Sequence, residues 1–394
     1  MKHSLHGIKV LDVTQVMAGP FCAMLLCDMG ADVIKIEPPG GDTTRHWGEH
    51  PGTDSAAFNA VNRGKRGVVI DLKKPEGAEI VKRLALSCDI FIENYRPGVM
   101  KRFGLDYPSL RAENADVIYA SISGYGQTGP AAHKGGFDLI AQGVSGIMSV
   151  TGESGRSPVK AGVPLTDLGA GLFALGGVLA ALHHRTKTGV GQQIDTSLVE
   201  SGLALSIWEA TEYFETGRTP QPFGSAHRMS APYQAFRCAD GFITIGAAND
   251  RLFLRLCELL EHPEWANDPK YGSNADRVKN HRVLADKVEA ITVRRDSSEW
   301  LELLDANGIP CGPINSYADA VEDPHMKARE MVVATEHETL GEIRTLGTPL
   351  KLSETPLRPG RPAPLLGQHT DEILTEAGVP EELIKQLKQS GVVS

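Results

Sequence analysis

The sequence predicts an α/β fold, with a Rossmann-like large domain built on a parallel sheet and a smaller α/β domain. Two observations lead to this fold class. Apolar runs of strand length alternate with helical segments as far as residue 123, and the chain, at 394 residues, is long enough for two domains. Strands that alternate with helices in this order pair in parallel, because each helix returns the chain to the same end of the sheet.

The individual elements follow from apolar runs and from helix start and stop signals. We expect strands at residues 8–13, 31–37, 68–72, 89–95 and 117–123, and helices at residues 20–29 and 75–88. Pro20 and Pro75 each suit a first helical turn, and Gly30 suits a helix end. A glycine-rich stretch from 123 to 167 lets the backbone approach a ligand or another chain closely. Helices are expected again at residues 168–185 and 196–216.

Composition narrows the classes of function. Hydrophobic residues make up 41% of the chain and charged residues 23%, as in ordinary globular proteins. The formal net charge of −9 argues against nucleic acid as a partner. The apolar run 168–182 is shorter than a membrane-spanning helix, so we expect a buried helix and no membrane partner. Residues 1–10 contain no apolar signal core, which predicts a cytoplasmic location.

The usual motifs for bound cofactors are missing. None of the six cysteines forms a Cys-x-x-Cys pair, so no metal site is expected. The first strand, turn and helix resemble a dinucleotide site, but Pro20 stands where the second glycine of the fingerprint is expected. We therefore expect no nicotinamide or flavin, although the turn can still offer helix N-terminal amides to a ligand.

Asp167 stands just before the apolar helix expected at 168–185, and two interpretations compete for it. As an N-cap, its carboxylate would accept hydrogen bonds from the first helical turn. As a nucleophile, it would stay ionised because a helix N-terminus lowers the pKa of a carboxyl group, and it would attack an acyl carbon. A carboxylate fully engaged in capping would be a poor nucleophile, so both interpretations remain open here.

Two groups of basic residues are candidates for ligand binding. The first surrounds the second strand–helix–strand unit and comprises Lys73, Lys74, Arg96, Lys101 and Arg102. These side chains are either solvated or bind the phosphates of a nucleotide. The second is the pair His227 and Arg228, which is either an exposed loop pair or a site for a substrate carboxylate.

Ordered sequence blocks then point to a family. They read VLD at 10–12, AGPF at 18–21, ADVIKIEP at 31–38, GDTTR at 41–45, NRGKR at 62–66, ENYRPG at 93–98, SGYGQTGP at 123–130 and PLLGQHT at 364–370. With these blocks the chain resembles the class III CoA-transferases, which include formyl-CoA transferase and carnitine CoA-transferase, along nearly its whole length. The segments 121–125, 224–227 and 232–236 are similar to those of the succinyl-CoA:glutarate subfamily.

The resemblance implies roles for particular residues. Asp167 falls on the nucleophilic aspartate. CoA-binding positions fall on Met17, Ala18, Ile70, Lys73, Asn94, Tyr95, Arg102, Gly135 and Asp138. Met17 stands where formyl-CoA transferase has a glutamine, and the mobile glycine run of that enzyme is missing, which argues against formyl-CoA as substrate. His227 and Arg228 would contact the substrate.

The resemblance also implies an activity and an architecture. The enzyme would transfer CoA from a donor such as succinyl-CoA to a dicarboxylate such as glutarate, through an aspartyl anhydride and an aspartyl-CoA thioester. CoA thioesters are then substrates, and no cofactor is bound permanently. We expect a large domain at 1–220, a small domain with its linkers at 221–325, and a segment, 326–394, that returns to the large domain. Two such chains would form an interlocked homodimer.

Two alternatives compete with CoA transfer. A 2-methylacyl-CoA racemase of the same fold would need a histidine base immediately before Asp138, where this chain has Phe137. A phenyl ring cannot accept a proton, so the racemase is disfavoured. A CoA-binding protein without catalysis is the other alternative, and the presence of Asp167 argues against it.

Overall fold

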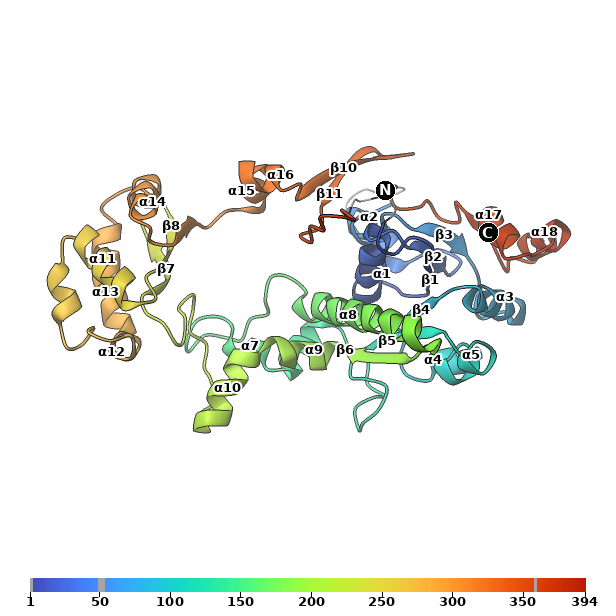
Figure 1. The fold of residues 1–394 in the computed structure, drawn as a ribbon, viewed down its shortest axis with the longest axis horizontal. Coiled ribbons are helices and arrows are strands. Elements are labelled where there is room, and N and C mark those ends of the chain that lie inside the picture. Colours follow the sequence, from blue (N-terminus) through green and yellow to red (C-terminus); the bar gives the residue numbers. More distant parts are fainter. Residues whose placement is uncertain (1–2, 49–53, 358–359) are drawn as a thin grey trace. The chain divides into compact units, whose positions relative to one another are not determined.

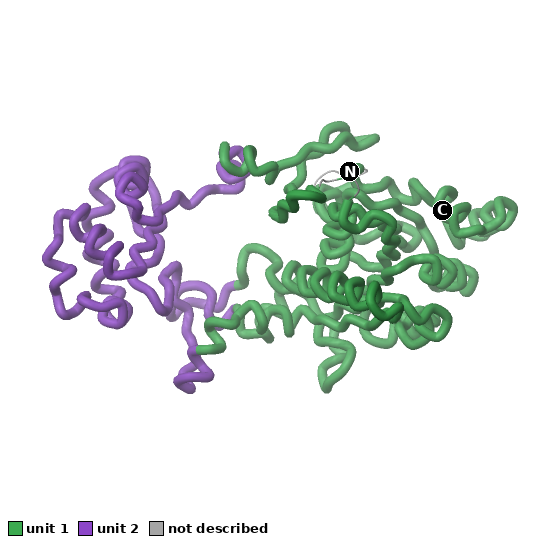
Figure 2. The backbone as a smooth tube through the Cα atoms, viewed as in Figure 1, with its two compact units in different colours: residues 1–147, 160–211, 324–394 green, residues 148–159, 212–323 purple. Residues whose placement is uncertain are grey.

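The computed structural model describes residues 3–48, 54–357 and 360–394, and the chain divides into two compact units (Figure 2). Unit 1 comprises residues 1–147, 160–211 and 324–394, and unit 2 comprises residues 148–159 and 212–323. The main difference from the expected domains is the segment 148–159. It lies in the glycine-rich stretch that we assigned to the large domain, but it belongs to unit 2.

Unit 1 is built on a six-stranded parallel sheet with the order β3-β2-β1-β4-β5-β6 (Figure 1). The strands are β1 (Lys9–Asp12), β2 (Asp32–Glu37), β3 (Arg66–Val69), β4 (Ile90–Glu93), β5 (Ile118–Ser123) and β6 (Gln193–Ser197). This is the strand order of a Rossmann fold, which confirms the predicted fold class. The order reverses between β1 and β4, and in such sheets ligands bind beyond the carboxyl ends of the strands at this point.

Helices cover both faces of this sheet. The first part of unit 1 contains α1 (Ala18–Asp28), a 3₁₀ helix (Thr43–His46), α2 (Ala56–Asn62), α3 (Pro75–Leu86), α4 (Val99–Arg102), α5 (Tyr107–Glu113) and α6 (Asp138–Val144). The remaining elements are α7 (Ile147–Val150), α8 (Leu165–Thr188), α9 (Leu198–Leu205), α10 (Ile207–Thr216), α16 (Pro324–Ala328), β10 (Val332–His337), β11 (Gly341–Leu346), α17 (Thr370–Glu376) and α18 (Glu381–Gln389). Of these, α7 and α10 cross the boundary between the units.

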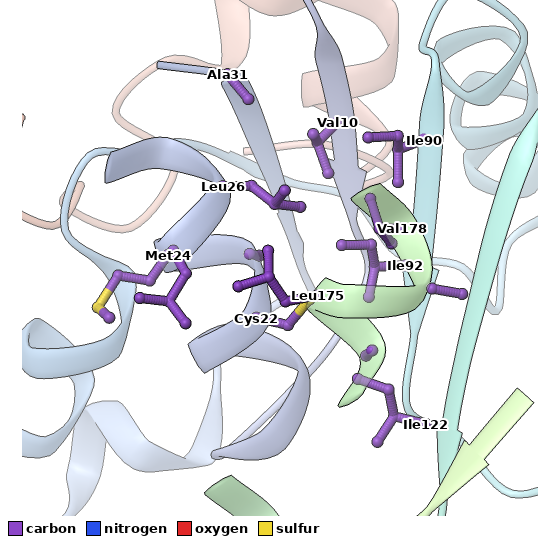
Figure 3. Packing of buried hydrophobic residues seen from close by; sticks show 14 of the residues in the cluster. Val10, Cys22, Met24, Leu26, Ala31, Ile90, Ile92, Ile122, Leu175 and Val178 are labelled. Atoms are coloured by element: carbon purple, nitrogen blue, oxygen red, sulfur yellow. The ribbon is translucent and has the colours of Figure 1, made fainter. Parts of the chain in front are cut away.

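Side chains alternate between two buried cores, one on each face of the sheet. Figure 3 shows the first core, in which Cys22 and Leu26 of α1 and Leu175 and Val178 of α8 pack with Val10, Ile90 and Ile92 of the strands. The second core contains the neighbouring strand residues Leu11 and Phe91, together with side chains from α3, α5, α17 and α18. Unit 1 is therefore a three-layer α/β/α sandwich.

Helix α8 is long and apolar enough to span a membrane by length and composition alone, but here it is a core helix of unit 1. It packs against α1, α9, β5 and β6. Small residues allow close contact: a Cβ atom at Gly171 would lie 2.7 Å from the carbonyl oxygen of Ala18 on α1. The N-terminal ends of α1 and α8 therefore lie side by side.

Strand β6 was not predicted: no element was expected at residues 193–195, and residues 196–216 were expected to form one helix. The segment Gln193–Ser197 instead forms the sixth strand, followed by α9 and α10. Its side chains are mostly exposed or half-buried at the edge of the sheet. An edge strand with polar side chains lacks the continuous apolar run by which a buried parallel strand is recognised.

Unit 2 is the smaller α/β unit. It contains β7 (Tyr233–Arg237), β8 (Phe242–Gly246), α11 (Asp250–Leu259), a 3₁₀ helix (Pro263–Asn267), α12 (Asn274–Lys279), α13 (His281–Thr292), α14 (Ser297–Ala306), β9 (Cys311–Pro313) and α15 (Tyr317–Glu322). Its three strands form an antiparallel sheet, and its core contains the buried rings of Phe236, Trp265 and Trp300. The chain then returns to unit 1, where Ile70 at the end of β3 pairs with Val393.

Candidate active site

The loops that follow β1 and β4 meet where the strand order reverses. The backbone amide of Gln15 donates to Oδ1 of Asn94 at 2.9 Å, and Nδ2 of Asn94 donates to the carbonyl oxygen of Gln15 at 2.7 Å. The side-chain Nε2 of Gln15 donates to the hydroxyl of Tyr95 at 2.7 Å. These bonds join the two loops at the place where a ligand is expected in a Rossmann-like sheet.

Helix α8 brings Asp167 to the same place. Gly171 lies one turn after Asp167 on the same face of α8, and it touches Ala18. A cavity of about 220 Å³ lies between these elements. Its lining comprises Gln15, Val16, Met17, Ala18, Asn94, Tyr95, Ile122, Ser123, Gly124, Gly136, Phe137, Asp167 and Leu198. Of the predicted site residues, Asp167, Met17, Ala18, Asn94 and Tyr95 therefore surround one cavity.

Asp167 is not the N-cap of α8. The helix begins at Leu165 with Pro164 at the cap position, so Asp167 is the third helical residue rather than the residue before the helix. Asp138 takes the capping role instead: its Oδ1 accepts from the amide of Thr166 at 3.0 Å and from the hydroxyl of Thr166 at 2.8 Å. Within the described ranges, the carboxylate of Asp167 has no hydrogen-bond partner.

The expected low pKa of Asp167 is wrong. Burial, and after it the negative charge of Asp138, raise the pKa of the Asp167 carboxyl to about 7. The described residues that line the cavity include no lysine, arginine or histidine that could offset these effects. Desolvation at this position therefore outweighs the influence of the helix N-terminus on which the expectation was based.

A second cavity, of about 380 Å³, shares Gln15 and Tyr95 with the first. It is lined by Val13, Gln15, Ile36, Pro38, Ile70, Asp71, Leu72, Lys73, Tyr95, Val99, Arg102 and Phe103. The predicted CoA-binding residues Ile70, Lys73 and Arg102 thus lie together. Apolar side chains line most of this cavity, and Lys73 and Arg102 provide positive charge.

Two further predicted residues lie beside these cavities. Gly135 packs against Arg96: a Cβ atom at Gly135 would lie 2.5 Å from Nη2 of Arg96. It lines neither cavity, although the next residue, Gly136, lines the first. Asp138 is occupied as the cap of α8, and its Oδ2 also accepts from Nε2 of the buried Gln142 at 2.7 Å. Asp138 thus supports the helix that carries Asp167.

His227 and Arg228 belong to unit 2, and both contact other residues of that unit. Arg228 donates to the carbonyl oxygen of Gln221 and lies 3.9 Å from the carboxylate of Glu212. The ring of His227 packs against Tyr233, with 5.2 Å between ring centroids. Their assignment as substrate contacts stays a prediction.

Sequence reasoning missed Gln15 and Val16, which line the first cavity. Both follow the first predicted strand directly, so the rule that ligands bind beyond the carboxyl ends of parallel strands could have found them. Phe137 also lines this cavity, as a phenyl ring with no titratable group. Among the described lining residues, Asp167 and Tyr95 alone carry titratable side chains, so the pair of bases that a racemase needs is absent there.

The model of CoA-transferase family III matches residues 5–370. The chain belongs to this family, and it is a CoA-transferase. It is 42% identical over 392 residues to the succinyl-CoA:glutarate CoA-transferase of Mus musculus, covering 99% of this chain and 90% of that protein. It is 40% identical over 383 residues to the succinate–glutarate CoA-transferase of Agrobacterium fabrum, covering 95% of this chain and 96% of that protein.

A solved structure shares the fold of this chain. The crystal structure of a CaiB/BaiF family protein from Brucella suis is 38% identical and superposes with a TM-score of 0.86. The match covers 96% of this chain and 100% of that chain. The arrangement of the strands and helices around Asp167 is therefore that of a known architecture.

Proposed function

We propose that this chain transfers CoA from succinyl-CoA to a dicarboxylic acid such as glutarate, with the carboxylate of Asp167 as the covalent nucleophile. One observation carries this proposal. Asp167 faces a cavity between two helix N-termini, and its oxygens have no hydrogen-bond partner among the described residues. A carboxylate that is free of hydrogen bonds keeps its lone pairs available for attack.

The two neighbouring cavities suit the two ends of an acyl-CoA. The second cavity offers apolar walls, including Pro38 and Ile70, for an adenine ring and Lys73 and Arg102 for phosphates. The pantetheine chain would pass Gln15 and Tyr95, which line both cavities, and place the thioester beside Asp167.

The proposed reaction proceeds by exchange of CoA through Asp167. The ionised Asp167 attacks the thioester carbon, which forms a mixed anhydride and releases CoA thiolate. The thiolate then attacks the aspartyl carbonyl, which gives an aspartyl-CoA thioester and frees succinate. The acceptor carboxylate attacks this thioester to form a second anhydride, and the released thiolate attacks the acceptor's carbonyl. The products are the new acyl-CoA and a regenerated Asp167 carboxylate.

Each attack creates an oxyanion that needs hydrogen-bond donors. The first-turn amides of α1, at Met17, Ala18 and Gly19, have no acceptor in the described parts of the chain, and Met17 and Ala18 line the cavity with Asp167. These amides are the donors that we assign to the oxyanion.

The choice of a dicarboxylate rests on the relatives, whose names state succinate and glutarate as substrates. Arg228 is our assignment for the second carboxylate of the acid, because its planar fork suits a carboxylate. Arg228→Ala should then raise the KM for the acid more than the KM for the acyl-CoA. Equal use of acetate and glutarate by the wild type would contradict the dicarboxylate assignment.

Oxygen-18 tests the covalent role of Asp167. With acceptor acid labelled in its carboxylates, each turnover leaves the bridging oxygen of the second anhydride on Asp167. Mass spectrometry of the peptide that contains residue 167 should show this label accumulating, and hydroxylamine added during turnover should give a hydroxamate at the same residue. If neither modification reaches Asp167 while transfer proceeds, the acyl group passes through another residue or directly to the acceptor.

We also propose that two chains associate as an interlocked dimer. Large apolar side chains are exposed on three helices of unit 1 that contact one another, and on the start of α10, which follows α9: Leu139, Ile140 and Val144 on α6, Leu172 and Phe173 on α8, Leu203 and Leu205 on α9, and Ile207 and Trp208 on α10. Large apolar side chains gathered in this way are typical of a protein interface. Light scattering should give twice the chain mass of 42.4 kDa. A folded monomer at low concentration would contradict the interlocked arrangement.

A further inference from the structure

Val16, on the wall of the cavity that holds Asp167, has an unusual backbone conformation. Its φ angle is +70°, in the left-handed region. A β-branched side chain rarely adopts this conformation, and such outliers persist only where the surrounding structure holds them in place. The groups bonded to the preceding peptide hold Val16 in this conformation.

The peptide group between Gln15 and Val16 is fixed at both ends. Its carbonyl oxygen, on Gln15, accepts from Nδ2 of Asn94 at 2.7 Å. Its N–H, on Val16, donates to Oδ2 of Asp42 at 3.2 Å. Because this plane is held from both sides, the φ and ψ angles of Val16 alone decide the direction of the next peptide, which carries the Met17 N–H.

A buried ion pair supports the Asp42 end. Nζ of Lys35 lies 3.1 Å from Oδ2 of Asp42 and donates to the carbonyl oxygen of Thr14 at 2.9 Å. Neither Lys35 nor Asp42 is exposed. Burial alone would raise the pKa of Asp42, but the Lys35 ammonium and the bonds from Thr44 lower it, so the pair is ionised at neutral pH. This pair touches neither cavity directly.

We infer that the buried Lys35–Asp42 pair is a positioning element for catalysis, which holds Val16 in its left-handed conformation and so aims the amides of Met17 and Ala18 at the oxyanion formed on the acyl carbon. This inference rests on the proposed attack by Asp167. It assigns Lys35 and Asp42 an effect on kcat although they act only through the backbone of another residue. Glycine adopts positive φ freely, so a glycine at position 16 needs less support from Asp42.

The test is a set of variants that couples Asp42 to Val16. Asp42→Asn keeps an oxygen for Thr44 but replaces the oxygen that accepts from Val16 and Lys35. We expect kcat to fall about 100-fold, the size of effect seen when one oxyanion donor is lost, while the KM for acyl-CoA stays nearly constant. The double variant Asp42→Asn with Val16→Gly should recover about tenfold of this loss, because glycine reaches the left-handed conformation without strain.

A matched control removes a buried ion pair at the other end of α1. Asp28 pairs with Arg63 at 2.7 Å in the same unit, and neither residue lines the two cavities. Asp28→Asn should keep kcat near that of the wild type although it too breaks a buried pair. If Asp42→Asn does not fold, Val16→Pro tests the same link, since proline fixes φ near −65° and should lower kcat at least as strongly in a folded protein.

Three outcomes would overturn the inference: a wild-type kcat for the folded Asp42→Asn or Val16→Pro variant, no recovery in the double variant, or an equal loss of kcat in Asp28→Asn. Asp167→Ala is measured in the same series. Loss of transfer in Asp167→Ala together with unchanged kcat in Asp42→Asn would reject the positioning role and leave the proposed nucleophile intact.

Discussion

Two turns of unit 1, the loop before α1 and the first turn of α8, line the same cavity, and each involves an aspartate: the buried Asp42 holds the first turn, and the half-buried Asp167 is part of the second. Asp42, which holds the first turn, is paired with the buried Lys35, and its pKa lies below the usual value. Asp167, in the second turn, has no cation beside it among the described residues that line the cavity, and burial with the charge of Asp138 raises its pKa to about 7. The fold therefore places a cation beside the carboxylate that fixes the backbone and none beside the carboxylate that reacts.

The same difference appears in the hydrogen bonds. Asp42 accepts from Val16, Lys35 and Thr44, so its lone pairs are engaged. At α8 the capping bonds fall on Asp138. A nucleophile and a structural carboxylate thus differ through their neighbours and not through residue type.

The largest expected effect is on turnover at Asp167. Asp167→Ala removes the nucleophile and should lower kcat by at least about 10⁴-fold, as for other covalent catalysts. Because the carboxylate has no hydrogen bond to lose within the described parts of the chain, the free energy of unfolding should not fall. Steady-state kinetics and urea unfolding measure the two quantities. Normal turnover, or a clear loss of stability, in Asp167→Ala would show that Asp167 has a structural role and is not the nucleophile.

Replacing the buried Lys65 should lower the free energy of unfolding, in contrast to Asp167→Ala. Nζ of Lys65 is fully buried and bonds to Asp12 at 2.8 Å, to Asn62 and to the carbonyl oxygen of Pro20. Lys65→Met leaves Asp12 as an unpaired buried charge, so the free energy of unfolding should fall by about 3–5 kcal/mol. A decrease below about 1 kcal/mol in urea unfolding, the size of an exposed pair, would contradict this structural role.

The raised pKa of Asp167 predicts a pH dependence. Only the ionised carboxylate attacks, so kcat/KM should fall about tenfold per pH unit below about 7 and level off above it. Asp138→Asn keeps an oxygen for Thr166 but removes the negative charge, so the fall of kcat/KM should begin at a lower pH than in the wild type.

Glu93 provides the control for that experiment, because burial raises its pKa to about 7 as well. Its Oε2 accepts from the amide of Tyr95 at 2.8 Å, a bond that Glu93→Gln can keep. The fall of kcat/KM at low pH should persist in Glu93→Gln. If the fall of kcat/KM at low pH disappears in Glu93→Gln and is unchanged in Asp138→Asn, Glu93 and not Asp167 controls the pH dependence.

The smallest expected effects concern exposed cations. Lys73 and Arg102 are exposed residues on the wall of the second cavity. Lys73→Ala and Arg102→Ala should each raise the KM for acyl-CoA about five- to tenfold, because each removes a charge-assisted contact to phosphate, with little change in stability. Unchanged KM values in both variants would show that these side chains are solvated and do not bind the phosphates of CoA.

Several features could be predicted from the sequence because they depend on neighbouring residues in the chain. The alternation of apolar runs and helices is local, and it predicted five of the strands of the parallel sheet. The ordered blocks from Val10 to Thr370 indicated the family, and through it Asp167. The polar edge strand β6 escaped prediction because its side chains carry no buried pattern.

The chemical state of the site was decided by tertiary structure alone. Local sequence placed Asp167 at a helix start, which by itself lowers the pKa of a carboxyl group. Its actual environment is set by burial and by Asp138, which lies 28 residues before Thr166 in the chain and accepts the capping hydrogen bond from the Thr166 amide. The left-handed Val16 likewise depends on Asp42 and Asn94, which come from other connections of the sheet. Desolvation and charge act through space, so residues distant in sequence determine which aspartate is free to react.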